Sequence, residues 1–190
     1  MPRVGLSTTA VVNAAIEVID EQGVEALTLA AVAARTGVAP PSLYKHVAGL
    51  AELRTLVGIR VITEMTDRFV AAVLGRSGDD AVAVLLRTYR DYVREHPARY
   101  ASVPPDPLHD PAMVDAGTRM LQVFLAALRE YGLTDSAAIH ATRCGRSIAH
   151  GFASLEATGG FGLPEDLDET YERLIDMFVA SLPRGTRTGR

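Results

Sequence analysis

Apolar side chains recur every three or four residues along most of the chain, a spacing typical of α-helices with one buried face. We find no convincing alternation of apolar and polar positions, so no strand is expected. Long apolar stripes are centred in residues 50–74, 82–96, 114–131, 135–157 and 167–182. Four prolines crowd a loop between the second and third of these stripes. The pattern therefore predicts an all-α fold.

Three shorter helices are expected before residue 50. The first lies between the capping candidates Ser7–Thr9 and Gly23. The second has Thr28 as its N-cap and ends at Gly37, because a sharp turn there favours a residue that tolerates positive φ. The third extends from about Pro40 to Val47. Proline is tolerated at its first positions, because the N–H group that proline lacks would have no intrahelical partner there.

The chain is thus expected to have three parts: a helix-turn-helix head over residues 1–49, a helical body over 50–183, and a disordered tail over 184–190. Of the 190 residues 48% are hydrophobic and 22% charged, which allows a core in a water-soluble protein. The single cysteine, Cys144, excludes an internal disulfide and is expected inside the core. No apolar run has the length of a signal peptide or a membrane span, so we expect a cytoplasmic protein without a membrane partner.

The second and third short helices have the arrangement that places one helix in the DNA major groove while the other braces it. The expected buried positions of this pair are Val32, Ala33, Val38, Leu43 and Val47. That assignment turns Pro41, Ser42, Lys45 and His46 outward, where short, polar or cationic groups can approach bases and phosphates. Tyr44 lies between them and can give its hydroxyl to a phosphate.

The charge of this segment is unusual for a DNA-binding protein. The whole chain has a formal net charge of −4, and through residue 56 four basic residues stand against five acidic ones. Non-specific affinity for DNA comes mainly from lysine and arginine, which displace counterions from the phosphates. The head would therefore depend on helix N-termini, hydroxyls and two-fold binding.

The residues of this segment resemble the tetracycline-repressor (TetR) family of regulators over about residues 6–57. The matching residues are Ala14-Ala15, Gly23, Leu27-Thr28, Val32-Ala33, Gly37-Val38, Leu43-Tyr44, His46-Val47 and Leu53. The resemblance implies an all-helical homodimer whose head binds a palindromic double-stranded DNA operator, and whose larger C-terminal domain binds a small-molecule inducer that lowers DNA affinity. By position, Pro41 and Ser42 would lie at base edges, Lys45 would read or steer, and Tyr44 and His46 would hold phosphates. Thr28, at the start of the bracing helix, completes the expected DNA-binding set.

The sequence also departs from the family pattern. Ala30 and Ala31 stand where relatives often have polar or basic residues, and Leu50 stands where a phosphate-binding lysine is frequent. We expect operator contacts that are weaker and less dependent on salt. The alternative is a helical small-molecule-binding protein whose head no longer binds DNA.

The body offers candidates for a ligand pocket and for a dimer interface. A mostly apolar pocket with a few polar groups could be lined by Tyr89, Tyr92, Met120, Phe124, His140, Arg143 and Ser147. Close helix packing against a second copy is expected at Ala149, Phe152, Ala153, Leu174 and Phe178. In both cases the alternative is ordinary packing of the same residues inside one chain.

Catalytic and metal-binding interpretations find little support. His140 and Cys144 are four residues apart, but a third metal ligand is not evident near them in the sequence. The glycines at 159, 160 and 162 lack the strand-to-helix setting of a phosphate-binding loop. We expect a regulator that needs no metal or cofactor, with an enzyme using His140 and Cys144 as a third and weaker reading.

Overall fold

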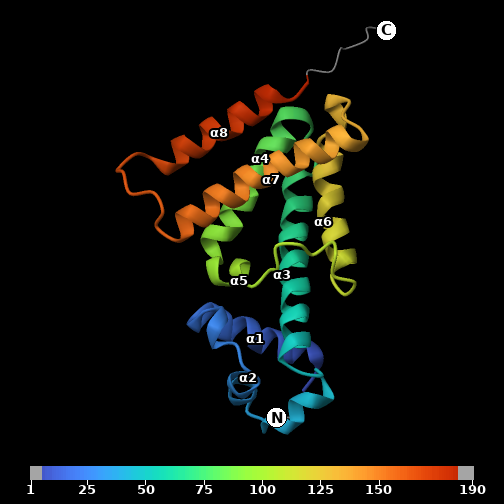
Figure 1. Cartoon of the computed structure of the whole chain (residues 1–190), viewed down its shortest axis with the longest axis vertical. Coiled ribbons are helices and arrows are strands. Elements are labelled where there is room, and N and C mark those ends of the chain that lie inside the picture. Colours follow the sequence, from blue (N-terminus) through green and yellow to red (C-terminus); the bar gives the residue numbers. More distant parts are fainter. Residues whose placement is uncertain (1–5, 184–190) are drawn as a thin grey trace. The chain divides into compact units, whose positions relative to one another are not determined.

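The computed structural model of the protein describes residues 6–183 and consists of helices joined by turns and loops (Figure 1). The α-helices are α1 (Thr8–Gln22), α2 (Leu29–Thr36), α3 (Leu50–Val73), α4 (Gly78–Glu95), α5 (Pro97–Ala101), α6 (Val114–Ala127), α7 (Asp135–Ala157) and α8 (Leu167–Ser181). The 3-10 helices are η1 (Val24–Ala26), η2 (Pro40–Lys45) and η3 (Arg129–Tyr131). Residues 6–183 contain no strand, so the predicted all-α fold is confirmed. The tail predicted to be disordered, residues 184–190, lies outside the described residues.

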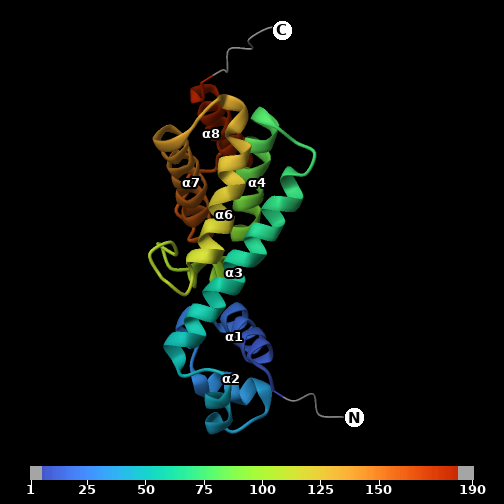
Figure 2. The same cartoon turned by 90° about the vertical axis from the view of Figure 1, so that its right-hand side faces the viewer.

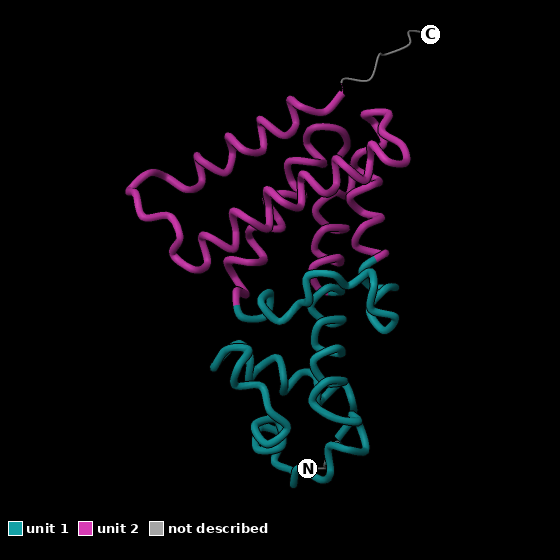
Figure 3. The backbone as a smooth tube through the Cα atoms, viewed as in Figure 1, with its two compact units in different colours: residues 1–63, 98–117 teal, residues 64–97, 118–190 magenta. Residues whose placement is uncertain are grey.

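The chain divides into two compact units (Figure 3). The first unit contains residues 1–63 and 98–117, and the second contains residues 64–97 and 118–190. The division falls inside α3, after the first residue of α5 and inside α6. The boundary that the sequence analysis placed at residue 50 stays a prediction of where the DNA-binding part ends.

Local capping explains where the helices of the first unit begin and end. The Ser7 side chain accepts a hydrogen bond from the N–H of Ala10 at 3.1 Å, and Thr28 accepts one from the N–H of Ala31 at 3.1 Å. These bonds satisfy N–H groups that have no partner within the first turn. Gly37 ends α2 in the left-handed region, at φ 69°. The caps that the sequence analysis named at Ser7 and Thr28 are therefore present.

The third short helix differs from the expected one. It is a six-residue 3-10 helix instead of an α-helix through Val47. Its hydrogen bonds span three residues, from the N–H of Ser42 to Ala39 and from the N–H of His46 to Leu43. The prolines at the first two positions do not explain the difference, because the N–H groups there have no intrahelical partner in an α-helix either. Short helical segments often take the tighter 3-10 geometry.

The first unit also includes the segment that follows α4. Arg99 of α5 donates three hydrogen bonds of 2.6–2.9 Å to the carboxylate of Asp20 at the end of α1. Further along this segment the methyl of Met113 lies so close to Gly58 of α3 that a Cβ there would approach it to 2.7 Å. The head and residues 98–117 are thus held together by side chains.

The second unit is built around α4, which packs closely on α7 and α8 (Figure 2). One face of α4 is buried through Leu85, Leu86, Tyr89 and Tyr92. Arg90 is also buried, at 5% exposure, and its guanidinium donates to both carboxylate oxygens of Glu156 at 2.7 and 2.8 Å. These contacts fix the end of α7 against α4.

Candidate DNA-binding face and ligand cavity

The polar face of η2 is open to solvent. Leu43 and Val47 anchor the segment in the core of the head, with exposed fractions of 0% and 2%. Tyr44 has an exposed fraction of 60%, and Pro41 and Lys45 are also exposed, whereas Ser42 and His46 are half-buried. Because the two buried residues are four positions apart and point into the core, the side chains between them point outward. Side chains that contact a nucleic acid need this orientation.

Two contacts set the position of this face. The Thr8 hydroxyl at the start of α1 donates to the carbonyl of His46 at 3.2 Å, which ties the end of η2 to α1. The carboxylate of Glu52, in the first turn of α3, accepts a hydrogen bond from the N–H of Ala48, which lies just before this helix. Neither contact was foreseen, although Glu52 lies where a capping glutamate is expected relative to the turn before α3.

The head has few cationic side chains, and one of them is paired with carboxylates of the chain itself. Arg35 forms ion pairs with Glu17 at 3.3 Å and with Glu21, and its hydrogen bond to Glu21 lowers the pKa of that carboxyl. Within residues 6–56 the remaining lysine and arginine side chains are Lys45 and Arg54, both exposed and without an ion pair to another residue of the described range 6–183. Arg54 was not among the predicted site residues, and its charge beside an exposed helix start is the signal that could have found it.

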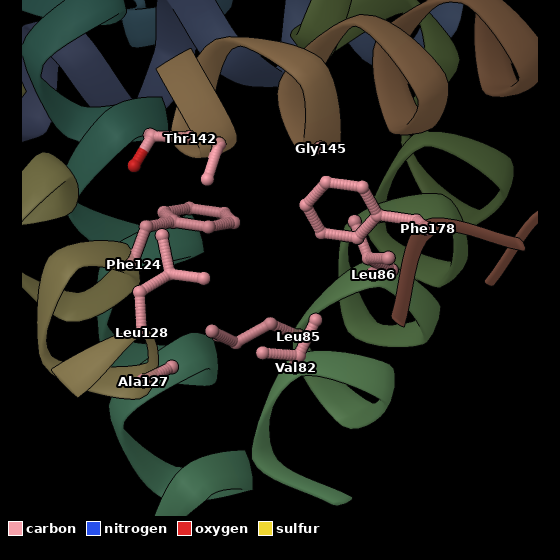
Figure 4. Close-up of a pocket in the computed structure, with 10 residues that line it drawn as sticks. Val82, Leu85, Leu86, Phe124, Ala127, Leu128, Thr142, Gly145 and Phe178 are labelled. Carbon is pink, nitrogen blue, oxygen red and sulfur yellow. The ribbon is translucent and has the colours of Figure 1, made fainter. Parts of the chain in front are cut away.

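The body contains a small apolar cavity between α4, α6, α7 and α8 (Figure 4). The lining from α4 consists of Val82, Leu85 and Leu86. The lining from α6 and the residue that follows it consists of Phe124, Ala127 and Leu128. The other two helices contribute Ala141, Thr142, Gly145 and Phe178. The volume is about 10 Å³, which is near the lower limit for holding one water molecule.

Phe124 is the predicted ligand residue that lines this cavity. Tyr92 is fully buried and donates its hydroxyl to Glu64 at 3.2 Å, and Tyr89 stacks on Phe69 with ring centroids 6.0 Å apart. Both tyrosines thus have partners in the core, as the alternative interpretation allowed. Met120 is half-buried on α6.

The remaining predicted ligand residues share the outer face of α7. The exposed residues of this face include His140, Arg143 and Ser147. None of the three lines the cavity, because α7 turns its small residues Ala141 and Gly145 toward α4 and α8. Cys144 is also exposed, so the expectation that it is a core residue was wrong. Its neighbours at i+1 and i+5, Gly145 and Ala149, take the inward positions instead.

The predicted dimer residues lie mainly inside the chain. Ala149, Phe152 and Ala153 have exposed fractions of 0%, 5% and 0% and face the core beside α4. Phe178 has an exposed fraction of 7% and lies against Gly145, and Leu174 is half-buried. Packing inside one chain, the alternative left open by the sequence, accounts for the buried residues of this set. A dimer interface stays a prediction.

The structure also bears on metal and membrane sites. Within residues 6–183 no three histidine, cysteine, aspartate or glutamate side chains gather closely enough to hold a metal ion. Among the described helices, none combines the length and apolar character needed to cross a membrane.

Comparisons with known proteins agree with this architecture. A family profile described as bacterial regulatory proteins of the tetR family matches residues 11–49, and one described as the tetracyclin repressor-like C-terminal domain matches residues 82–178. An uncharacterized HTH-type transcriptional regulator of Bacillus subtilis, YobS, is 35% identical over 182 residues, which cover 95% of each chain. The chain belongs to the TetR family of helix-turn-helix transcriptional regulators. This membership does not favour the alternative of a small-molecule-binding protein whose head no longer binds DNA.

Solved structures share the fold. A protein of unknown function from Rhodococcus sp. RHA1 aligns with a TM-score of 0.81 at 20% identity, covering 96% of this chain and 98% of that one. The TetR family protein ActR of Streptomyces coelicolor, in complex with (S)-DNPA, aligns with a TM-score of 0.69 at 20% identity, covering 92% and 96%.

Proposed function

We propose that this chain is a homodimeric repressor that a small-molecule ligand releases from a palindromic operator. The DNA-binding part of this proposal rests on one observation: one face of η2 is exposed to solvent, while its opposite side is anchored in the core of the head. Pro41 and Ser42 would meet base edges, Lys45 would steer or read, and Tyr44 and His46 would hold phosphates. Thr28 would support this face by fixing the start of the bracing helix α2.

The dimer would form through the outward faces of α7 and α8. Two large apolar side chains are exposed there, Leu155 at 49% and Met177 at 67%. Gly151 on α7 also leaves open space, because a Cβ at this glycine would meet no atom within 4 Å. A two-fold partner would place two η2 segments about 34 Å apart, which is one turn of DNA.

Ligand release follows the logic of a population shift. A ligand lowers operator affinity only by binding more tightly to the form whose recognition segments are misplaced. The solved complex of ActR with (S)-DNPA supports ligand binding by a protein with this fold. We assign the chain no catalytic role and place its action in the cytoplasm, where a regulator meets DNA.

A gel-shift assay against the DNA upstream of the chain's own gene tests operator binding. We expect a specific shift at low salt that Lys45→Ala weakens strongly and Arg129→Ala does not. Arg129 is the matched control because it is also an exposed cation but lies in η3 of the body. Absence of a shift, or equal effects of the two substitutions, would contradict DNA binding through η2.

A further inference from the structure

We propose that Arg143 on α7 and Asp176 on α8 form reciprocal ion pairs across the dimer, Arg143 of each subunit with Asp176 of the other. These pairs select a second copy of this chain as the partner and fix its orientation. The inference rests on the proposed homodimer and adds the residues that determine its specificity.

Arg143 is a cation without a counter-charge. Its side chain is exposed on the outer face of α7 and forms no ion pair with another residue of the described range 6–183. The sequence of α7 contains no aspartate or glutamate between Asp135 and Glu156, so no acidic side chain lies three or four positions from Arg143 on its own helix. Glu156 is already bound by Arg90 of α4. The guanidinium of Arg143 is therefore open to a carboxylate from outside the chain.

Asp176 is the matching anion on the next helix. It is exposed on the outer face of α8 and likewise forms no ion pair among residues 6–183. Two arginines lie near it, and both are engaged elsewhere. Arg173 pairs with Glu169 at 2.6 Å, and Arg87 of α4 donates to both carboxylate oxygens of Glu172 at 2.6 and 2.5 Å. Asp176 is thus an acceptor that the chain does not use itself.

The two charges lie on the same section of the α7–α8 pair. These helices are neighbours that run in opposite directions within the second unit (Figure 1). A Cβ at Gly145 would lie 3.2 Å from the Phe178 ring, which marks one common level of the two helices. Arg143 and Asp176 are each two residues from this level, so they are offset along the helices by only about 6 Å, or roughly one turn.

A two-fold axis that passes between α7 and α8 lays each α7 over the partner's α8. Arg143 then meets the partner's Asp176 within about one helical turn, an offset that the long arginine side chain can span. Because the axis relates the two subunits, the same pair forms twice. The next residues on the two outer faces, Ser147 and Ala180, are small and exposed, which allows the helices to approach closely at this level.

The charges supply what the apolar contacts of this surface lack. Leu155 and Met177 are exposed at 49% and 67%, and burying them favours association without setting a direction. Opposite charges fix the orientation, and like charges or an unpaired buried charge disfavour a wrong partner. A related chain without a carboxylate at this place would leave Arg143 desolvated and unpaired. The ion pairs therefore account for specificity, and the apolar residues account for affinity.

Charge reversal in the full chain tests the pairing by analytical ultracentrifugation at low salt. Arg143→Glu and Asp176→Arg each place like charges at both contacts, so each variant alone should be monomeric where the wild type is dimeric. We expect the dimer Kd of each to rise about a hundredfold or more. An equimolar mixture of the two variants should be dimeric again, because glutamate then meets arginine at one contact and aspartate meets arginine at the other. An ion pair within one chain would not give this recovery.

A matched mixture controls for the change in net charge. Arg129→Glu, on η3 outside both outer faces, alters the net charge as Arg143→Glu does. It should dimerise like the wild type and leave Asp176→Arg monomeric when the two are mixed.

The variant Arg143→Glu/Asp176→Arg covers the case in which a single variant folds poorly. It should form its own dimer and, in a pull-down with a tagged wild-type chain, should not exchange subunits with it. Single variants as dimeric as the wild type, a mixture that stays monomeric, or free exchange of the double variant with the wild type would overturn the ion pair and leave the α7–α8 dimer standing. A wild-type chain that is monomeric at all concentrations would overturn the proposed dimer itself.

Discussion

Replacing Arg90 with methionine should destabilise the second unit by about 3 kcal/mol. The Arg90 side chain is 6% exposed and donates to both oxygens of Glu156, at 2.7 and 2.8 Å. It also lies over the rings of Phe152 and Tyr171, with its guanidinium carbon 5.1 and 5.0 Å from their centroids. Hydrogen bonds to charged groups contribute about 1.5–3 kcal/mol each, and removing one partner of a buried pair costs about 3–5 kcal/mol. Arg94, 3.5 Å from Glu156, compensates in part and places the expected loss at the lower end.

Urea unfolding followed by far-UV circular dichroism measures this loss, since the chain has no tryptophan to report by fluorescence. The double variant Arg90→Met/Glu156→Leu should be more stable than Arg90→Met alone, because no buried carboxylate is left without its partner. Arg87→Met is the control: its ion pair with Glu172 has both side chains 44% exposed and is worth about 0.2–1 kcal/mol. Equal stability of the single and double variants, or a loss below about 1 kcal/mol for Arg90→Met, would refute the reasoning.

Three further predictions concern the dimer, the acid response and the head. The double variant Leu155→Arg/Met177→Arg should sediment as a monomer in analytical ultracentrifugation. The control Leu74→Arg, at a residue that is 82% exposed on the turn after α3, should remain dimeric. A double variant that is still dimeric would contradict the α7–α8 interface. The hydrogen bonds from Arg87 lower the pKa of Glu172 below 4.5, so their stabilising effect is present above pH 4.5 and is lost as the pH falls through the lower folded-state pKa. The stability difference between wild type and Arg87→Gln in urea unfolding should therefore be constant from pH 7 to 5 and vanish on further acidification, and a difference that grows in acid would show the sign to be wrong. Thr28→Ala should cost about 1 kcal/mol of thermal or urea stability through the lost N-cap, and Thr28→Ser should restore it; failure of the serine to rescue would mean that the hydroxyl does not act as a cap.

Local sequence rules predicted the helices of the head well. The caps at Ser7 and Thr28, the glycine at 37 and the buried positions Leu43 and Val47 all depend on contacts within a few residues. These contacts are encoded by side-chain type and spacing, so they can be predicted without the rest of the fold. The 3-10 geometry of η2 was missed because the spacing of Leu43 and Val47 and the prolines at the first positions are compatible with a short 3-10 helix as well as with an α-helix.

The faces of α7 were harder to predict. Its periodicity separates one side with His140, Arg143 and Ser147 from another with Ala149 and Ala153. Periodicity does not tell which neighbouring helix covers each side, because that depends on the packing of segments far apart in the sequence. The polar side was interpreted as part of a pocket and the small residues as a dimer contact, whereas the polar side faces solvent and the small residues face α4. The cavity residues Val82, Leu85 and Leu86 were part of a predicted stripe but could not be told from other core positions.

Footprinting of the purified chain on the DNA upstream of its gene tests the central claim most directly. A two-fold pair of η2 segments should protect two half-sites of inverted sequence with centres about one DNA turn apart. Tyr44→Ala and Lys45→Ala should remove the protection of both half-sites together, because each substitution is present in both subunits. Protection that survives these substitutions, or no protected site at low salt, would contradict the account.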